Sequence, residues 1–577
     1  MSKRSIRVFL LPLFACGVLA VFLACGSGEE TAAPAAAKGE SPLDKTVGYL
    51  PGYESREPEN GGTLARALPS DVVTLNAIVA PDFTSYLVYK WIFDPLIDYD
   101  IDMKPVGVLA ESWEVSEDNL VTTFHLRKNV TWHDGEPFDA DDVVFSYDTV
   151  MDPTVDAINK RPSFAKVEKV ERVDAHTVKV NWKQPYAPGI AAWNFHIMPE
   201  HVYGYGKGDG ESFNRHPKNA EPVGTGPFRF SEWKRGERVV LLANDDYFNG
   251  RPHLDKVIFK VIPQPETRLA SFKTGELDVT GISADQWNRL KGDRSFLDRV
   301  HIFEYYGRAY YFVGWNQDGS NPFFADKKVR QAMTYAMNRK GVVDRILLGH
   351  GTRATGPFYI KGWESNPAVK PYPYDPAKAS ALLEDAGWSD SDGDGIRDKD
   401  GEPFSFECLT VAEAPMFARF LEIFQQDLMR VGVKLEIRTI EWKVFQERTH
   451  RHAFQAYLTG WRIADDPDPY HMFHSSQAEL LEDGMGVGQN DVSYRNERLD
   501  ALIEEQLRTM DFEARQKVFW KIHELVAEDQ PHTYLFAASE TAAVRNDFQN
   551  VRVSRAGYGL FTWYPSLLEW WVPKDRQ

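Results

Sequence analysis

The sequence predicts a mixed α/β protein that is divided into two or three domains. Helical and strand patterns alternate along most of the chain, as they do in α/β and α+β architectures. From Gly61 onward, aliphatic and aromatic residues are frequent enough to fill a large core. The chain has 577 residues, of which the part that can form a core comprises about 500. Because one hydrophobic core rarely serves more than about 300 residues, we expect more than one domain.

The individual elements follow from periodicity and from capping residues. Residues 177–182 and 256–261 alternate between polar and apolar side chains, which is typical of half-buried strands. Asp375 and Pro376 form an N-cap and a first helical position, and Gly387 ends that helix. Further elements are expected as follows: a helix with Val329, Ala332, Met333, Ala336 and Met337 on its apolar face, a helix over residues 417–430, a strand with Leu435, Ile437 and Thr439 on one face, and a helix over residues 512–528.

The N-terminus has the pattern of an export signal. Lys3 and Arg4 precede an apolar run that ends at Cys25, which predicts a secretory signal peptide over residues 1–24. A cysteine at the cleavage site resembles the lipobox of bacterial lipoproteins, so we expect Cys25 to carry lipid. The alternative is an uncleaved membrane anchor, although the run is short for a spanning helix and contains Pro12. Residues 25–48 are polar and rich in alanine, and we expect them to form a flexible tether.

Composition excludes several classes of protein. The three cysteines are Cys16 in the signal, Cys25 and Cys408, which leaves no pair for a disulfide framework. The formal net charge of −18 argues against nucleic acid as a partner. We find no nucleophile elbow, zinc-protease motif or phosphate-binding loop. Residues 163–166 and 273–275 match short motifs of penicillin-binding enzymes, but Gly275 is better explained as a helix C-cap. We therefore expect no enzymatic activity.

Two groups of residues are candidate metal ligands. Asp390, Asp392, Asp394 and Asp398 stand at positions 1, 3, 5 and 9 of a calcium-loop pattern. Position 12 should be glutamate but is Gly401, so both a structural Ca²⁺ and an empty acidic turn remain open. The second group consists of His450, His452, His471 and His474. Neither histidine pair supplies three or four ligands, so we interpret these four residues as surface histidines.

Several sequence blocks resemble the family 5 extracellular solute-binding proteins, the peptide- and nickel-binding components of ABC importers. Residues 109–118 (LAESWEVSED) and 124–143 (FHLRKNVTWHDGEPFDADDV) match the signature of that family. Residues 224–228 (GTGPF), 270–278 (ASFKTGELD), 329–332 (VRQA) and 461–469 (WRIADDPDP) follow in the order and at the spacing of the family. The long signature itself reads as scaffold, because Asp139 and the acids after it cap a helix.

The resemblance implies an α/β, two-lobed periplasmic-binding-protein-like fold of type II. It has three domains and a hinge near Tyr305 and Ala538 that closes the lobes around the ligand. The implied boundaries are residues 49–82, 222–305 and 540–577 for the discontinuous domain I, 83–221 for the inserted domain II, and 306–539 for domain III, which forms the second lobe.

The resemblance also implies a ligand site in the cleft. The backbone of Trp461, Arg462, Ile463 and Ala464 would pair with an extended peptide, and the carboxylate of Asp465 would neutralise the ammonium group of the peptide. This chain has one residue more between Trp461 and the aspartate than we expect of peptide binders, so Asp466 is the alternative. Two tyrosines at the start of the second lobe, Tyr306 and Tyr310, are expected to contact ligand.

The implied function is capture of peptides and their delivery to an ABC permease and its ATPase subunits. The protein is expected to be a monomer, anchored by lipid on the periplasmic face or the cell surface of a bacterial membrane. The alternative function keeps the fold but exchanges the ligand for an oligosaccharide, a metal chelate or an opine, for uptake or for signalling.

Overall fold

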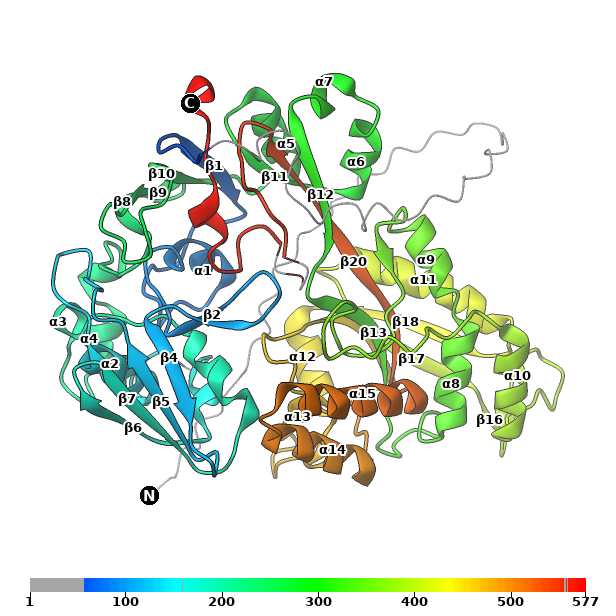
Figure 1. The fold of residues 1–577 in the computed structure, drawn as a ribbon. Coiled ribbons are helices and arrows are strands. Elements are labelled where there is room, and N and C mark those ends of the chain that lie inside the picture. The colour runs from blue at the N-terminus through cyan, green and yellow to red at the C-terminus, as the bar shows by residue number, and fades with distance from the viewer. Residues whose placement is uncertain (1–56, 158, 555–556, 558) are drawn as a thin grey trace. The chain divides into compact units, whose positions relative to one another are not determined.

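A computed structural model describes residues 57–577 apart from residues 158, 555–556 and 558. The chain divides into two compact units (Figure 1). Unit 1 contains the described residues up to Tyr305 together with Glu540–Gln577, and unit 2 contains Tyr306–Ser539. Unit 1 thus holds the residues expected for domains I and II, and unit 2 those expected for domain III. The three-domain division stays a prediction. The predicted signal peptide, Cys25 and the tether lie outside the described residues.

Unit 1 is built on a mixed sheet. In this sheet β1 pairs in parallel with β10 and β11, and β9 joins β8 to β10 in an antiparallel arrangement. The second half of β20 pairs with β11 through residues 541–544. The bounds are β1 (Thr63–Leu68), β8 (Phe228–Lys234), β9 (Arg238–Ala243), β10 (Lys256–Val261), β11 (Val279–Ile282), β12 (Val300–Tyr306), β20 (His532–Arg545), α5 (Pro265–Thr274), α6 (Ala284–Leu290) and α7 (Arg294–Leu297).

A second, four-stranded antiparallel sheet of unit 1 has the order β4–β5–β7–β6. α2 packs against β6 and β7, and its N-cap Asp139 forms a capping box with Asp142. The bounds are β4 (Ala110–Val115), β5 (Val121–Leu126), β6 (Val167–Asp174), β7 (Thr177–Trp182) and α2 (Ala140–Met151). The short elements of unit 1 are α1 (Phe83–Tyr89), β2 (Ile97–Tyr99), β3 (Pro105–Gly107), η2 (Arg161–Phe164), η3 (Ala187–Asn194), α3 (Glu200–Tyr203), α4 (Gly210–Asn214), η4 (Pro217–Asn219), η6 (Ser566–Glu569) and η7 (Lys574–Arg576).

Unit 2 has a sheet of the order β18–β17–β19–β13–β20. β13 lies between β19 and the first half of β20 and is antiparallel to both, whereas β17 and β18 are parallel. The strands are β13 (Ala309–Trp315), β14 (Gly351–Thr352), β15 (Asp398–Lys399), β16 (Glu402–Pro403), β17 (Ser405–Val411), β18 (Lys434–Ile440) and β19 (Ala456–Arg462). The helices are α8 (Lys327–Ala336), α9 (Arg339–Arg345), α10 (Pro376–Asp385), α11 (Pro415–Met429), α12 (Trp442–His450), α13 (Tyr470–Phe473), η5 (Ser475–Ala478), α14 (Glu497–Arg508) and α15 (Phe512–Asp529).

Most of the predicted elements are confirmed. β7 and β10 coincide with the two predicted strands, and α10 begins after its N-cap Asp375, whose side chain accepts the N–H of Lys378. α8, α11 and α15 match the other helix predictions to within two residues. Gly275 caps α5 with a φ of 83°, so residues 273–275 end a helix as expected. β18 confirms the predicted strand, and its alternation places Leu435, Ile437 and Thr439 on one face.

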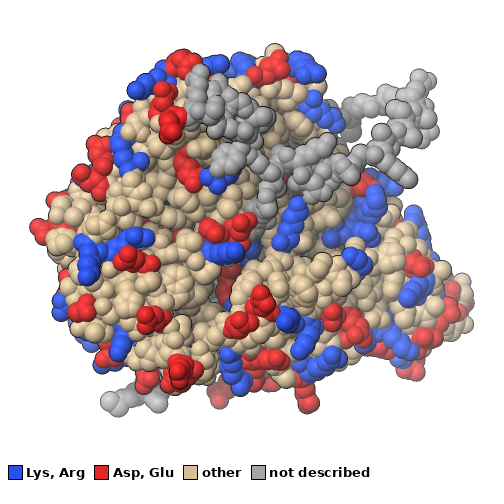
Figure 2. Space-filling view, viewed as in Figure 1, with Lys and Arg blue, Asp and Glu red and all other residues tan. Residues whose placement is uncertain are grey.

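Charged side chains of both signs are interspersed on the face shown in Figure 2 and do not gather in one basic patch there.

Large aromatic side chains fill the interior of each unit; Trp132 and Trp193 in unit 1 and Trp315 and Trp388 in unit 2 are almost completely buried. Among the helices of the described residues, none combines the length and the apolar character needed to span a membrane.

Candidate functional site

The predicted ligand-binding segment lies at the end of β19, in unit 2. Trp461 is paired with Tyr310 and Arg462 with Ala309 in the antiparallel ladder to β13. One residue beyond the strand, the N–H of Ile463 donates to the carbonyl oxygen of Arg308 at 2.9 Å. Along its whole length, β19 is therefore held by β13 on one of its two edges.

The other edge of β19 is paired over only part of its length. The parallel partner β17 pairs with Ala456 and Tyr457, and within the described residues no strand pairs with this edge beyond Tyr457. In an antiparallel ladder, backbone groups alternate between the two edges. Since Ile463 bonds toward β13, the backbone N–H and C=O groups of Gly460 point to the other edge, beyond the last residue that pairs with β17. An extended chain can add to such an edge.

A turn with three acidic residues follows the strand, and each of them has a different environment. Asp465 is exposed. Asp466 is half-buried, and both of its carboxylate oxygens accept hydrogen bonds from Arg515 of α15, at 2.6 Å from Nη1 and 2.8 Å from Nη2. Such a fork-to-fork pair is the strongest arrangement of this charge pair. The structure thus commits Asp466 to an internal ion pair.

Asp468 is linked to the same arginine through Gln506 of α14. The Gln506 side chain accepts hydrogen bonds from Arg515 Nε and Nη2, at 3.1 and 2.8 Å, and donates to Asp468 Oδ1 at 2.8 Å. Asp468 also accepts the N–H of Tyr470 at 3.0 Å. Loss of solvent around Asp468, together with the nearby charge of Asp466, raises the pKa of Asp468 to about 7.

A second arginine holds the beginning of the turn. Arg308, which precedes β13, donates from Nη2 to the carbonyl oxygen of Ala464 at 2.7 Å. The guanidinium of Arg308 also lies 3.9 Å from Glu364 Oε1, and both side chains are buried. Burial raises the pKa of Glu364, and Arg308 opposes that shift. The turn is therefore tied to the interior of unit 2 at Ala464, Asp466 and Asp468.

The two predicted tyrosines are not exposed. Tyr310 is fully buried, and its ring packs beside those of Phe312 and Tyr534. Tyr306 is 7% exposed, and the ammonium group of Lys361 lies 5.7 Å from the centre of its ring. The burial of Tyr310 favours a packing role, and the ligand contacts of both tyrosines stay predictions.

The acidic turn before β15 brings together part of the predicted calcium site. Asp390, Asp392 and Asp394 are exposed, and one carboxylate oxygen of each lies within 4.8 Å of the others. Asp398 is instead bonded to the N–H and hydroxyl groups of Ser391, which lower the pKa of Asp398. The structure thus assembles three of the four predicted carboxylates.

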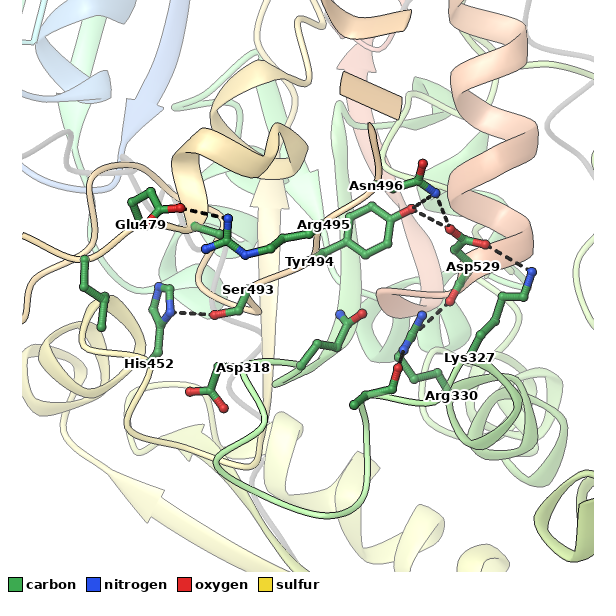
Figure 3. A pocket seen from close by; sticks show the side chains of 14 residues that line it. Asp318, Lys327, Arg330, His452, Glu479, Ser493, Tyr494, Arg495, Asn496 and Asp529 are labelled. Atoms are coloured by element: carbon green, nitrogen blue, oxygen red, sulfur yellow. Dashed lines mark hydrogen bonds and ion pairs between the residues drawn. The ribbon is translucent and has the colours of Figure 1, made fainter. Parts of the chain in front are cut away.

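A cavity of about 920 Å³ lies elsewhere in unit 2 (Figure 3). It borders Gln317 and His452, next to the end of the β13–β19 ladder where Trp315 pairs with Ala456, opposite the end that carries Trp461. His452 is 5% exposed, and its Nδ1 lies 2.7 Å from Ser493 Oγ. The prediction of a surface histidine is therefore wrong for His452, because its side chain is buried, like that of Phe454 two residues later.

The residues that organise the turn were not predicted from the sequence. Arg308, Glu364, Gln506 and Arg515 come from four separate parts of the chain, and none of them stands in a recognisable motif. Only the acidic turn itself is visible in the sequence. Its arginine partners become identifiable when folding brings α15 and the start of β13 beside it.

Comparison with known proteins places this geometry in a family. The model of the bacterial extracellular solute-binding proteins, family 5 Middle, matches residues 104–479. The chain is 29% identical to the oligopeptide-binding protein AppA of Bacillus subtilis over 576 residues, which cover 98% of this chain and 99% of AppA. It is also 28% identical to the heme-binding protein A of Haemophilus influenzae over 460 residues, which cover 76% of this chain and 80% of that protein.

Solved structures of family members also resemble this protein. AppA of Bacillus subtilis in complex with a nonapeptide matches with a TM-score of 0.69 at 29% identity, covering 90% of this chain and all of AppA. NikZ of Campylobacter jejuni in complex with Ni(L-His) matches with a TM-score of 0.70 at 28% identity, covering 88% of this chain and 99% of NikZ. Because the family model matches more than half of the chain, and because the two-lobed α/β fold of these structures extends over nearly all of it, this protein belongs to the bacterial extracellular solute-binding proteins of family 5.

Proposed function

We propose that this protein captures peptides outside the cytoplasm and delivers them to the permease of an ABC importer. The observation that supports this proposal is the edge of β19 with which, in the part of the chain that the structure describes, no strand pairs beyond Tyr457. Added to such an edge, a peptide gains backbone hydrogen bonds that do not depend on its side chains. The similarity to AppA over 98% of the chain supports a peptide as the ligand.

Recognition of the peptide amine is assigned to Asp465. This residue is exposed and lies three residues beyond the end of β19. The carboxylate of Asp466 is bonded to Arg515. A carboxylate that becomes enclosed by the ligand forms a strong charge-assisted bond with an ammonium group. We expect Asp465→Asn to weaken the binding of peptides with a free N-terminus by about 30-fold to several thousandfold, measured by calorimetric titration.

The matched control uses the same peptides with acetylated N-termini, which carry no ammonium group. Their affinities should not change between the wild-type protein and the Asp465→Asn variant. If the substitution leaves the affinity for free peptides intact, the amine assignment is wrong.

Native mass spectrometry of the protein purified from cells tests the ligand class. A set of adducts with peptide masses that are lost on denaturation would support the proposal. The similarity to the heme-binding protein and to NikZ makes a metal chelate the main alternative, and a single adduct of that kind would replace the peptide. Adducts with an oligosaccharide or opine mass would replace it as well.

We further propose that Cys25 anchors the protein to a bacterial membrane as a monomeric lipoprotein. The support is the order of basic residues, apolar run and cysteine at the N-terminus. Mass spectrometry of the N-terminal peptide should find an acylated Cys25 as the first residue. A peptide that begins at Met1 would contradict cleavage and favour the uncleaved anchor.

A further inference from the structure

We propose that Arg515 is a positioning residue for ligand recognition: by holding Asp466, it fixes the turn so that Asp465, and not Asp466, meets the ammonium group of the ligand. This inference rests on the proposed peptide function and deepens it. It assigns a specificity role to a residue on α15, which is 50 positions away from Asp465 in the chain.

The geometry of Arg515 suits a clamp. Its fork engages both oxygens of Asp466, and its Nε and Nη2 engage Gln506. Arg515 is 7% exposed and Gln506 is completely buried. The guanidinium lies 5.3 Å from the centre of the Phe519 ring and 5.8 Å from that of Trp363. Packing of this kind fixes the position of the guanidinium, which in turn fixes Asp466.

The clamp reaches the turn at more than one residue. Through Gln506 it also holds Asp468, and Arg308 independently holds the carbonyl oxygen of Ala464. Ala464 and Asp466, the two chain neighbours of Asp465, are both held in this way, so the backbone of Asp465 has little freedom to move. A group held in this way loses less conformational entropy when it binds a ligand.

Charge balance points the same way. The charge of Asp466 raises the pKa of Asp468, and it also raises the pKa of Glu364. Arg515 opposes the rise in the pKa of Asp468, and Arg308 opposes the rise in the pKa of Glu364. Without Arg515, Asp466 would be an unpaired carboxylate among other acids. It would then compete with Asp465 for the ligand ammonium group and distort the turn.

The experiment compares Arg515→Lys with Arg339→Lys. Arg339 is also buried in unit 2, but its guanidinium donates to the carbonyl oxygens of Tyr534 and Tyr372, away from the turn. For each variant, the affinity for one peptide is measured with a free and with an acetylated N-terminus. The ratio of the two affinities measures amine recognition separately from folding.

We expect Arg515→Lys to lower this ratio by about tenfold, because lysine cannot form the fork. Arg339→Lys should lower the melting temperature without changing the ratio. Asp466→Asn should act like Arg515→Lys, and the double variant should be no worse than either single variant, since the two residues act as one unit. Deuterium exchange at residues 463–468 of the ligand-free protein should rise in Arg515→Lys only.

Distinct outcomes would overturn the inference. An unchanged affinity ratio in Arg515→Lys, or unchanged exchange in the turn, would remove Arg515 from recognition. Loss of the ratio in Asp466→Asn but not in Asp465→Asn would make Asp466 the amine-binding residue. If the wild-type protein itself does not distinguish free from acetylated peptides, the proposed amine recognition fails, and the role of Arg515 fails with it.

Discussion

Asp465, Asp466 and Asp468 lie in one short turn, yet they differ in what their carboxylates can do. Asp465 is exposed, Asp466 forms a bidentate ion pair with Arg515, and Asp468 is hydrogen-bonded to Gln506. The sequence shows three equivalent acids in a turn-forming run. Their different roles arise from the helices packed behind the turn, because α14 supplies the amide and α15 supplies the guanidinium.

Asp468 predicts a pH dependence of stability. Its pKa is about 7 in the folded protein and about 3.9 in an unfolded chain. Between these values the folded state binds more protons, so the contribution of Asp468 to stability is present below pH 4 and is lost as the pH rises to about 7. Asp468→Asn should remove this loss. The free energy of unfolding of the variant relative to the wild type should therefore be roughly 1–3 kcal/mol higher at pH 8 than at pH 4.

Urea unfolding of the wild-type protein and of Asp468→Asn at both pH values measures this difference. The side-chain oxygen of the introduced asparagine would still accept from Gln506 and Tyr470, so the variant changes the charge with little change in bonding. Equal pH dependence in the two proteins would show that Asp468 keeps an ordinary pKa.

At the scale of elements, one edge of β19 is fully paired, and the other edge is paired, among residues 57–577 as far as they are described, only at Ala456 and Tyr457. If a peptide adds to the second edge, each ligand amide that donates to β19 contributes a hydrogen bond. N-methylation of such an amide should weaken binding by about 0.5–1.5 kcal/mol, and by little at the alternate positions. Calorimetry with a series of singly N-methylated peptides tests this alternation, and a uniform effect along the series would argue against strand addition.

The acidic turn of Asp390, Asp392 and Asp394 is a separate element, and its calcium prediction is open to a direct test. A cation bound only by the folded state raises its stability with concentration. If Ca²⁺ binds there, millimolar Ca²⁺ should raise the melting temperature of the wild-type protein by a few degrees, and Asp392→Asn should abolish the rise. No rise in the wild-type protein would leave this segment as an acidic turn.

At the scale of the whole molecule, the chain passes between the two units at residues 305–306 and 539–540. A small number of such crossings is compatible with a hinge between the units. We expect a saturating peptide to lower the radius of gyration measured by X-ray scattering, with acetylated peptide at the same concentration as the control for amine-dependent binding. An unchanged scattering curve at saturation would contradict closure of the lobes.

Much of the fold was predictable because its signals are local. The N-cap Asp375, the C-cap Gly275 and the alternation of residues 256–261 each act within a few residues, and each prediction was correct. The surface position predicted for His452 was wrong, since burial depends on what covers a residue and not on its local sequence pattern.

The sequence by itself determined the α/β class, the main elements and the family resemblance, and it singled out the segment from Trp461 to Asp465, with Asp466 as the alternative, as the candidate site. These depend on short-range periodicity and on long matched blocks. Only the tertiary structure decided that Asp466 is committed to Arg515, that Tyr310 is buried and that, among the described residues, no strand pairs with one edge of β19 beyond Tyr457. The physical reason is that ion pairs, burial and strand pairing join residues distant in the chain, whose partners no local pattern specifies.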